Sequence, residues 1–557
     1  MQLNTISDLK LTVGTEANQY ADVLGYYTIG DQGGGAFYWD ESSTQTDNGG
    51  TIIQVTGTAL GRWKRIFNDA LYGKWFGAKG DGINDDTLAL QSAIDEVGEK
   101  SGTLILQQGI YKTSSTLYIS KENLSIEGLG NPITFSREAE ITEGVTIRYT
   151  GTGTAIQVCK SRSLDPITDA TNPGWMFKIS IQNIRIEVST NAKRALWVFQ
   201  SVNSYFANIS MWGNEGPGSE LLKVSGGVNN SYFLIETNGS GRTGTSPIPT
   251  AFEDPHTEKC ANLGLGWAND TATTTTFTKC YFHYGIIGLQ TLYFFRFVDC
   301  VIEGNWRGLN ADNDAIVSFD KCWFEANSNR DAYFGRGSFT FTDCVVNAYD
   351  DRAGYNREQI FDCAGVNRIV FDNCSIGSDH PAPYIFGSNP SGSYLFNVAA
   401  TTLGAITFNN CTIDPKFNMG HIYNYDRGII DISSDPKRVL QFKDTFIEST
   451  AKELSTLNDT GTAYIMPYDG YVTAIHYYSK FNLSAGEVLL ILVKNHTGWV
   501  AGDTVSSLPF EKKWAPRLLR FSKGDHIGVT MDTSFDFAPG NTMAADIYVS
   551  FFQNSSI

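Results

Sequence analysis

The feature that most constrains the fold of this chain is a short pattern, a Phe followed three positions later by a Cys. Successive cysteines of the pattern lie 20, 22, 22, 30 and 37 residues apart, so each repeat has a constant core and an insertion of variable length. Such a repeat is typical of a solenoid, in which each turn buries its inward face only against its neighbours. The six pairs are Phe277/Cys280, Phe297/Cys300, Phe319/Cys322, Phe341/Cys344, Phe371/Cys374 and Phe408/Cys411.

The residues around each Cys indicate strands rather than helices. Apolar and polar residues alternate at a period of two, whereas a helical repeat needs apolar residues at a spacing of 3.6. The residue before each Cys is polar and fits a bend between two short strands, with the Phe and the Cys pointing inward. The same frame, with Ile in place of Cys, covers 181–186 and 206–211, and Cys260 lies 20 residues before Cys280. The sequence therefore predicts an all-β protein built around a parallel β-helix.

Charge and cysteine content exclude several classes of function. The chain has 42 basic and 59 acidic residues, a net charge of −17 without a basic run, so we expect neither nucleic acid nor an anionic membrane as a partner. No stretch of 18 apolar residues occurs, which predicts no membrane insertion, and the amino terminus lacks the pattern of a signal peptide. Six of the nine cysteines share one inward position. We therefore expect buried thiols rather than disulfides or metal ligands, and neither a metal nor a cofactor.

Strand patterns divide the chain into three parts. Residues 1–70 predict a small, strand-rich module punctuated by glycine. Residues 71–435 predict the β-helix. Residues 436–557 contain several strand-like runs separated by short turns, which predicts an antiparallel β-sandwich.

An amphipathic helix is predicted at about 86–98, where it would close the open end of the β-helix. Asp85 or Asp86 would cap its amino terminus. The acidic residues here do not follow the spacing of a calcium-binding EF-hand loop, so capping is the better interpretation.

The segment around this helix carries a resemblance to known proteins. Gly77-Ala78-Lys79-Gly80-Asp81-Gly82, with Asp85-Asp86-Thr87 and Gln91-Ser92-Ala93-Ile94, resembles the motif that begins the fold of the pectate-lyase-like right-handed β-helix superfamily. Together with the glycine-rich module at 25–67, it looks like the tailspike depolymerases, or capsule depolymerases, of bacteriophages.

The resemblance implies a homotrimeric virion fibre that binds and cleaves a bacterial surface polysaccharide, such as capsule, exopolysaccharide or O-antigen. Such a protein is made in the host cytoplasm, joins a phage tail or baseplate protein, and acts outside the bacterial cell surface. The carboxy-terminal β-sandwich would then cap the trimer or bind glycan.

Candidate catalytic residues follow from aligning the turns by their cysteines. Three positions after the Cys, the aligned residues include His283, Glu303 and Glu325. Glu303 and Glu325 are thus expected to be neighbours on adjacent turns, both facing solvent. Two such carboxyls repel, which raises the pKa of one and suits glycoside hydrolysis by an acid and a base. His283 would carry a proton or donate a hydrogen bond. Nearby residues expected to bind sugar are Asn305, Trp306, Arg307 and Asn327.

Other interpretations of the site stay open. Alternative catalytic carboxylates are Asp312 and Asp314 on the next strand and Asp350 and Asp351 after the Cys344 turn. The site could also be shared between subunits of a trimer, with the insertions at 237–258 and 349–360 as walls of a groove. A lyase would use a cation such as Arg307, Arg330 or Arg336 to neutralise a uronic acid. A receptor-binding fibre without catalysis and a purely structural spike complete the alternatives.

Overall fold

The computed structural model forms two compact units, Met1–Ala332 and Tyr333–Ile557. The residues that the structure describes are 1–131, 144–163, 165–167, 173–213, 216–239, 257–264, 272–291, 294–311, 315–327, 330–347, 359–363, 365, 368–377, 394–398, 405–413, 421–422, 430–432, 438–445, 452–453, 463–465, 470–479, 488–494, 497–505, 510–514, 519–521, 526–533 and 542–551.

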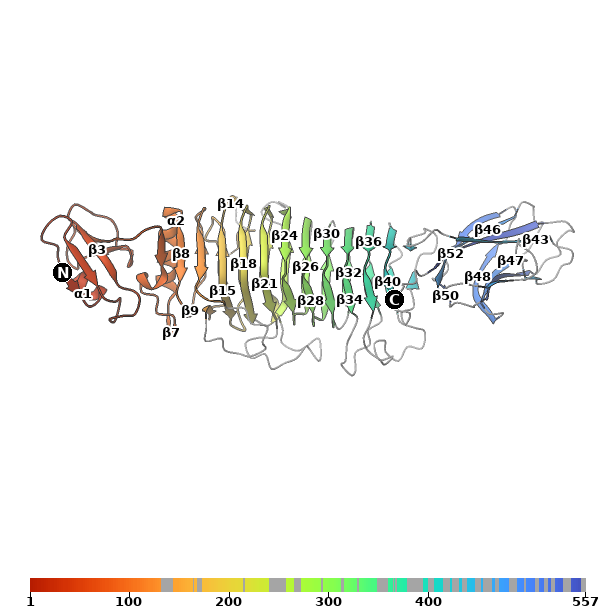
Figure 1. Ribbon diagram of the computed structural model, residues 1–557, viewed down its shortest axis with the longest axis horizontal. Coiled ribbons are helices and arrows are strands. Elements are labelled where there is room, and N and C mark those ends of the chain that lie inside the picture. The colour runs from red at the N-terminus through yellow and green to blue at the C-terminus, as the bar shows by residue number, and fades with distance from the viewer. Residues whose placement is uncertain are drawn as a thin grey trace, which may run out of the picture. The chain divides into compact units, whose positions relative to one another are not determined.

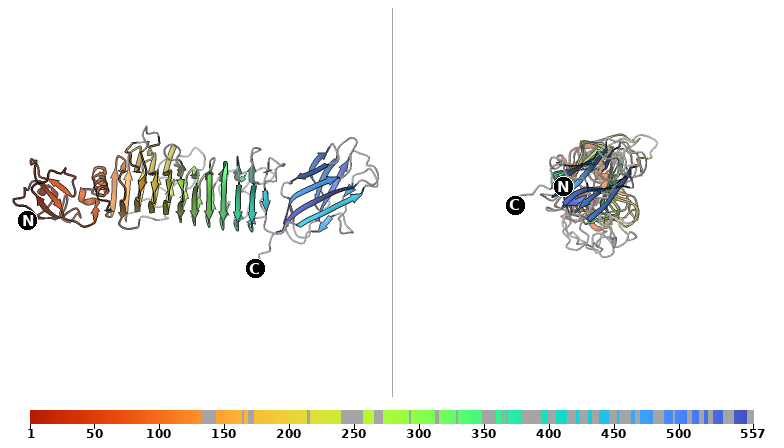
Figure 2. Two further views of the ribbon diagram at one scale, coloured as in Figure 1. Left: turned by 90° about the horizontal axis from the view of Figure 1, so that it is seen from above. Right: turned by 90° about the vertical axis from the view of Figure 1, so that its right-hand side faces the viewer.

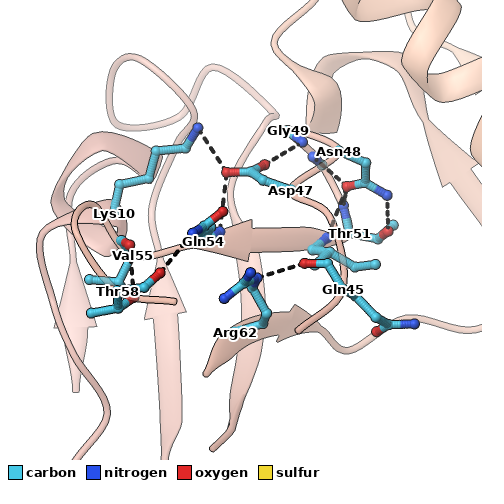
Figure 3. Close-up of polar contacts among 12 residues, drawn as sticks. Lys10, Gln45, Asp47, Asn48, Gly49, Thr51, Gln54, Val55, Thr58 and Arg62 are labelled. Atoms are coloured by element: carbon cyan, nitrogen blue, oxygen red, sulfur yellow. Dashed lines mark hydrogen bonds and ion pairs between the residues drawn. The ribbon is translucent and has the colours of Figure 1, made fainter. Parts of the chain in front are cut away.

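The first unit begins with a five-stranded sheet in the order β1-β2-β3-β5-β4. Its core contains Trp39 and Trp63, whose ring centroids lie 5.3 Å apart. A turn before β4 is held by the carboxylate of Asp47, which accepts hydrogen bonds from the backbone N–H groups of Gly49 (2.7 Å) and Gln54 (3.1 Å) (Figure 3). The elements are β1 (Gln2–Leu3), α1 (Ile6–Lys10), β2 (Tyr20–Val23), β3 (Gly35–Asp40), β4 (Ile52–Gln54) and β5 (Arg62–Arg65).

A parallel β-helix, as the repeat predicts, makes up the rest of the first unit. One sheet has the order β10 (Leu117–Ile119), β13 (Thr154–Val158), β16 (Arg194–Phe199), β19 (Gly216–Ser225), β22 (Thr257–Gly264), β26 (Ile287–Thr291) and β29 (Arg307–Ala311), followed by β32 (Arg330–Phe334). A small second sheet contains β14 (Met176–Phe177), β17 (Ser201–Val202), β20 (Gly227–Val228) and β23 (Ala272–Thr273).

The third and longest sheet carries the Phe and Cys positions. It begins with β6 (Ala70–Tyr72), β7 (Asp81–Asp85), β8 (Thr103–Leu106), β9 (Gly109–Thr113), β11 (Ser125–Gly128) and β12 (Val145–Tyr149). Its following strands are β15 (Ser180–Val188), β18 (Tyr205–Gly213), β21 (Ser231–Asn238), β24 (Thr275–Thr278), β25 (Tyr281–His283), β27 (Phe294–Val298), β28 (Val301–Glu303), β30 (Ala315–Asp320) and β31 (Trp323–Glu325).

A helix covers the beginning of this β-helix, as the sequence predicts. It is α2 (Thr87–Lys100), and both ribbon views place it beside the first strands (Figure 1; Figure 2). Leu90 and Ile94 of α2 face a cluster of aliphatic side chains from β8, β10 and later strands. At its start the Asp85 carboxylate accepts from the N–H of Thr87 at 3.0 Å. The Asp86 carboxylate instead accepts from the backbone N–H groups of Lys79 and Gly80, at 2.6 and 3.0 Å, in the segment before β7 (Asp81–Asp85). A 3₁₀ turn, Gly73–Phe76, comes before β7.

The inward positions stack as the repeat predicts. Phe277, Phe297 and Phe319 form parallel ring pairs with centroids 5.1 and 4.9 Å apart. All nine cysteines are free thiols. Cys260, however, does not belong to this series, because it lies on β22 in another sheet. The bend residue before each Cys has a positive φ between 50° and 53°; these residues are Lys279, Asp299, Lys321, Asp343, Asn373 and Asn410.

The second unit contains further parallel strands and then two antiparallel sheets. The parallel strands are β33 (Gly337–Thr342), β34 (Val345–Asn347), β35 (Gln359–Cys363), β36 (Arg368–Asp372), β37 (Ser375–Gly377), β38 (Tyr394–Val398), β39 (Ala405–Asn409), β40 (Thr412–Ile413), β41 (His421–Ile422) and β42 (Ile430–Ile432). Phe341, Phe371 and Phe408 stack here at 4.7 and 4.9 Å.

The antiparallel sheets form the predicted β-sandwich. One contains β43 (Arg438–Thr445), β52 (Thr542–Phe551), β46 (Gly470–Ser479), β49 (Phe510–Trp514) and β50 (Leu519–Phe521). The other contains β44 (Lys452–Glu453), β45 (Ala463–Ile465), β51 (His526–Thr533), β47 (Val488–Lys494) and β48 (Thr497–Val505). None of the helices in the described parts of the chain is long and apolar enough to cross a membrane.

Candidate active site

Glu303 and Glu325 are directly paired on adjacent strands, β28 and β31, at the spacing that the cysteine alignment predicts. His283 on β25 pairs with Glu303 in the same way. Neighbouring parallel strands lie about 4.8 Å apart, so Glu303 begins one strand spacing from His283 on one side and from Glu325 on the other. Phe282, Ile302 and Phe324, which directly precede the three residues on their strands, are buried. Since successive side chains of a strand point to opposite faces, the row of His283, Glu303 and Glu325 faces away from the interior.

Each carboxylate of the pair is held by an aromatic side chain. The hydroxyl of Tyr281 donates to Oε2 of Glu303 at 2.8 Å, and the indole Nε1–H of Trp323 donates to Oε2 of Glu325 at 2.8 Å. Both glutamates are partly exposed, and Trp323 is 39% exposed. A hydrogen bond to an ionised acceptor is short and directional, so these contacts fix where the two carboxylates point.

Tyr281 remains a donor at any ordinary pH. Burial, and then the nearby carboxylate of Glu303, raise the pKa of Tyr281 far above its usual value. Removing the phenolic proton would place a second negative charge beside Glu303. The Tyr281 hydroxyl therefore serves to orient Glu303 rather than to act as a base.

His283 is more enclosed than the prediction assumed. It is 4% exposed, its Nε2 lies 3.3 Å from Oε1 of Glu236, and its ring stacks on Tyr281 with centroids 4.0 Å apart. Its Nδ1 has no hydrogen-bond partner among the residues that the structure describes. His283 thus belongs both to the row of Glu303 and to a buried network that continues along the sheet.

That buried network escaped the sequence analysis. The hydroxyl of Ser210 donates to Oε2 of Glu236 at 2.7 Å and accepts from Nε1 of Trp212 at 2.7 Å. The guanidinium of Arg185 lies 4.4 Å above the Trp212 ring, and its Nε is 3.0 Å from Oε1 of Glu187. In the turn that carries Glu236 the bend residue is Leu234, with φ 52°, so the polar marker is missing there, whereas Asn183 and Asn208 occupy the bends of the other two turns.

The prediction that Asn305 and Asn327 bind sugar is wrong. Both are completely buried. The amide of Asn305 donates to the carbonyls of Phe282 and Glu303, both at 3.0 Å, and its Oδ1 accepts from the N–H of Gly285 at 2.9 Å. These side chains satisfy backbone groups where the strand turns, and buried polar groups need such partners.

Two of the remaining predicted residues follow the turn after Glu303, and four lie outside the described residues. Trp306 follows the turn after Glu303, and Arg307 begins β29 in the other sheet; both are partly buried. Asp312, Asp314, Asp350 and Asp351 lie outside the described residues, as do 240–256 and 349–358 of the two insertions. Among the described residues, no group of three or more His, Cys, Asp or Glu is placed to hold a metal ion.

Comparison by sequence finds phage tail proteins. Residues 2–68 match the family described as the phage tail protein small four-stranded beta-sheet domain. A segment of 126 residues is 34% identical to the Mu-like prophage FluMu defective tail fiber protein of Haemophilus influenzae. That match covers 22% of this chain and 20% of the relative, so the chain spans about a fifth of the relative's length.

Comparison by structure finds tailspike proteins. The enzymatically active domain of tailspike protein 4 from bacteriophage CBA120 matches with a TM-score of 0.51 at 10% identity, covering 99% of this chain and 77% of that one. The tailspike protein of Acinetobacter phage vB_ApiP_P1 matches with a TM-score of 0.50 at 12% identity, covering 99% and 98%. At these identities the likeness establishes a shared fold.

Proposed function

We propose that this protein is a bacteriophage tailspike depolymerase that binds and cleaves a bacterial surface polysaccharide by glycoside hydrolysis. The observation that carries the proposal is the pair of partly exposed carboxylates, Glu303 and Glu325, in register on adjacent strands and each held by an aromatic donor. Two positioned carboxyl groups are the arrangement that most glycoside hydrolases use.

In this reaction one carboxylic acid protonates the oxygen of the scissile bond. The other carboxylate then activates water or attacks the anomeric carbon, depending on how far apart the two groups stand. The two glutamates supply both groups from one rigid sheet, and the hydrogen bonds from Tyr281 and Trp323 reduce the motion of their side chains. A fixed geometry lowers the entropic cost of reaching the transition state.

The amino-terminal match supports a place in the virion. A phage-tail β-sheet domain at residues 2–68 would join the spike to a phage tail or baseplate protein. The carboxy-terminal β-sandwich would cap a homotrimer or bind glycan. Synthesis in the host cytoplasm and action outside the bacterial cell surface belong to the same proposal.

The test is to incubate the protein with purified capsule, exopolysaccharide or O-antigen and to measure reducing ends. Glu303→Gln and Glu325→Gln should each lower kcat by about 100- to 10,000-fold, the usual contribution of acid–base catalysis. Asp299→Asn is the matched control, since it also removes one carboxylate, and Asn occupies the same bend at 373 and 410. Full activity in both glutamine variants would refute the role of the pair.

Two other outcomes would identify the alternatives. Products that absorb in the ultraviolet, from an unsaturated sugar, would indicate a lyase. Binding of the polysaccharide without any release of ends would indicate a receptor-binding fibre.

A further inference from the structure

The outward face around the carboxylate pair is acidic. On three successive strands, β25, β28 and β31, the outward positions that reach the surface include two carboxylates and neither Lys nor Arg. These positions are Tyr281, Val301, Glu303, Trp323 and Glu325, whereas the corresponding positions on β18 and β21, and His283 on β25, are at most 4% exposed. A negatively charged ligand would be repelled by this row.

The described basic side chains that are nearest in register lie on other strands. Arg185 and Arg148, the next cations on this face, lie on β15 and β12 and both contact Glu187, at 3.0 and 2.9 Å. Arg307 and Arg330 begin strands of the other sheet. Nε2 of His283 lies 3.3 Å from Oε1 of Glu236, and both side chains are buried.

Trp323 adds a surface for a sugar ring. It is one of the large apolar side chains that are exposed, and its Nε1–H is already engaged by Glu325. A ligand could therefore cover the face of the Trp323 ring while the indole N–H keeps its hydrogen bond to Glu325. Aromatic faces suit the C–H side of an uncharged sugar, and such flat contacts are common in ligand sites.

We propose that the sugar unit bound over Glu303 and Glu325 is uncharged, a neutral hexose or N-acetylhexosamine, and that it lies against Trp323. This inference rests on the proposed hydrolysis and specifies its substrate. A uronic acid in that place would set its carboxylate beside two others with no cation on the same strands to neutralise it. Acidic units of the polymer would then lie elsewhere along the chain of sugars.

The experiment identifies the sugar at each new reducing end. Polysaccharides that contain both neutral sugars and uronic acids are digested with the full-length protein, the ends are labelled with borodeuteride, and the labelled residue is read by mass spectrometry. We expect a hexose or N-acetylhexosamine in every substrate that is cleaved. A uronic acid at the labelled end would overturn this inference while leaving hydrolysis intact; an absence of cleavage would overturn the proposed function and the inference with it.

Two variants test the contact with Trp323. Trp323→Ala removes the ring and should raise KM about tenfold, the equivalent of roughly 1.4 kcal/mol of binding. Trp323→Phe keeps a ring but loses the N–H to Glu325, so it should retain most of the binding and lower kcat instead. Circular dichroism and melting temperature confirm that both variants are folded. Equal KM in the wild type and in Trp323→Ala would refute the contact.

Discussion

Polar side chains inside this β-helix differ in how far their hydrogen bonds are satisfied. Asn305 donates two hydrogen bonds from its amide to backbone carbonyls and accepts one from a backbone N–H. Tyr232 stands at the opposite extreme, stacked between Phe206 and Phe277 at 4.8 and 4.4 Å. Its buried hydroxyl has no hydrogen-bond partner among the residues that the structure describes.

Tyr232→Phe should therefore stabilise the protein. A buried polar group without a partner costs about 1–3 kcal/mol, and removing it leaves the aromatic stack intact. We expect a higher midpoint of urea unfolding with an unchanged m-value. Tyr111→Phe is the control, because the Tyr111 hydroxyl donates to the carbonyl of Gln107 at 2.7 Å and its loss should destabilise. A lower midpoint for Tyr232→Phe would contradict the expectation.

Glu220 makes a contribution to the free energy of unfolding that depends on pH. Burial alone would raise the pKa of Glu220, but Lys223, Arg194 and the amide of Asn262 outweigh it and lower the pKa below its usual value. A carboxyl whose pKa is lower in the folded state stabilises the fold above the pKa of the unfolded chain. That stability is lost as the pH falls through the folded pKa.

Glu220→Gln should destabilise the protein at pH 7 by about 3 kcal/mol, because it leaves the largely covered side chains of Arg194 and Lys223 without this counter-ion. The difference from the wild type should shrink as the pH is lowered below about 4, where the unfolded chain protonates this group. Urea unfolding at pH 7 and at pH 3.5 measures both values. A difference that is constant over this range would show that the charge of Glu220 is not responsible.

At the scale of the element, the bends decide where each long strand turns. Six of them place a Lys, Asp or Asn in the left-handed region, with φ between 50° and 53°. Asn and Asp tolerate this conformation best after Gly, whereas a β-branched residue does not. The residue before each Cys is therefore polar for two reasons: it faces solvent, and in most turns it is an Asn or Asp that tolerates the left-handed backbone conformation.

Asp299→Val should accordingly lower stability by about 1–2 kcal/mol, the cost of a left-handed conformation for such a residue. Asp299→Asn should leave the melting temperature nearly unchanged. Differential scanning calorimetry of the two variants compares them directly. If both variants melted together, the bend would not be the cause.

At the scale of the whole molecule, the proposed function as a tailspike implies that several copies of the chain assemble. We expect a homotrimer, with a mass close to three times 61.3 kDa in analytical ultracentrifugation. Closed symmetric assembly is the usual form of such homo-oligomers. A single species at the mass of one chain would refute the trimer and leave the fold of the chain unaffected.

The period-two pattern and the recurring Phe and Cys determined the parallel β-helix, the bends and the pairing of Glu303 with Glu325. The inward positions of each turn are apolar, so they can be recognised in the sequence. Because side chains alternate between the two faces of a strand, the inward positions also determine which residues face outward and which of these pair between turns. The repeat pattern was misleading at two positions. Leu234 occupies a bend where other turns have a polar residue, and Cys260 matches the spacing of the cysteines but lies on β22 in another sheet.

Only the tertiary structure decided which outward polar groups are covered. The sequence pattern does not distinguish Asn305, Asn327 and His283 from exposed polar residues. The two asparagines are nevertheless fully buried, and Nε2 of His283 lies 3.3 Å from Oε1 of Glu236. Burial depends on what neighbouring turns place beside a residue, and those neighbours are 20 or more positions away in the chain. A carboxylate's partner, such as Tyr281 for Glu303, is likewise settled by stacking between turns.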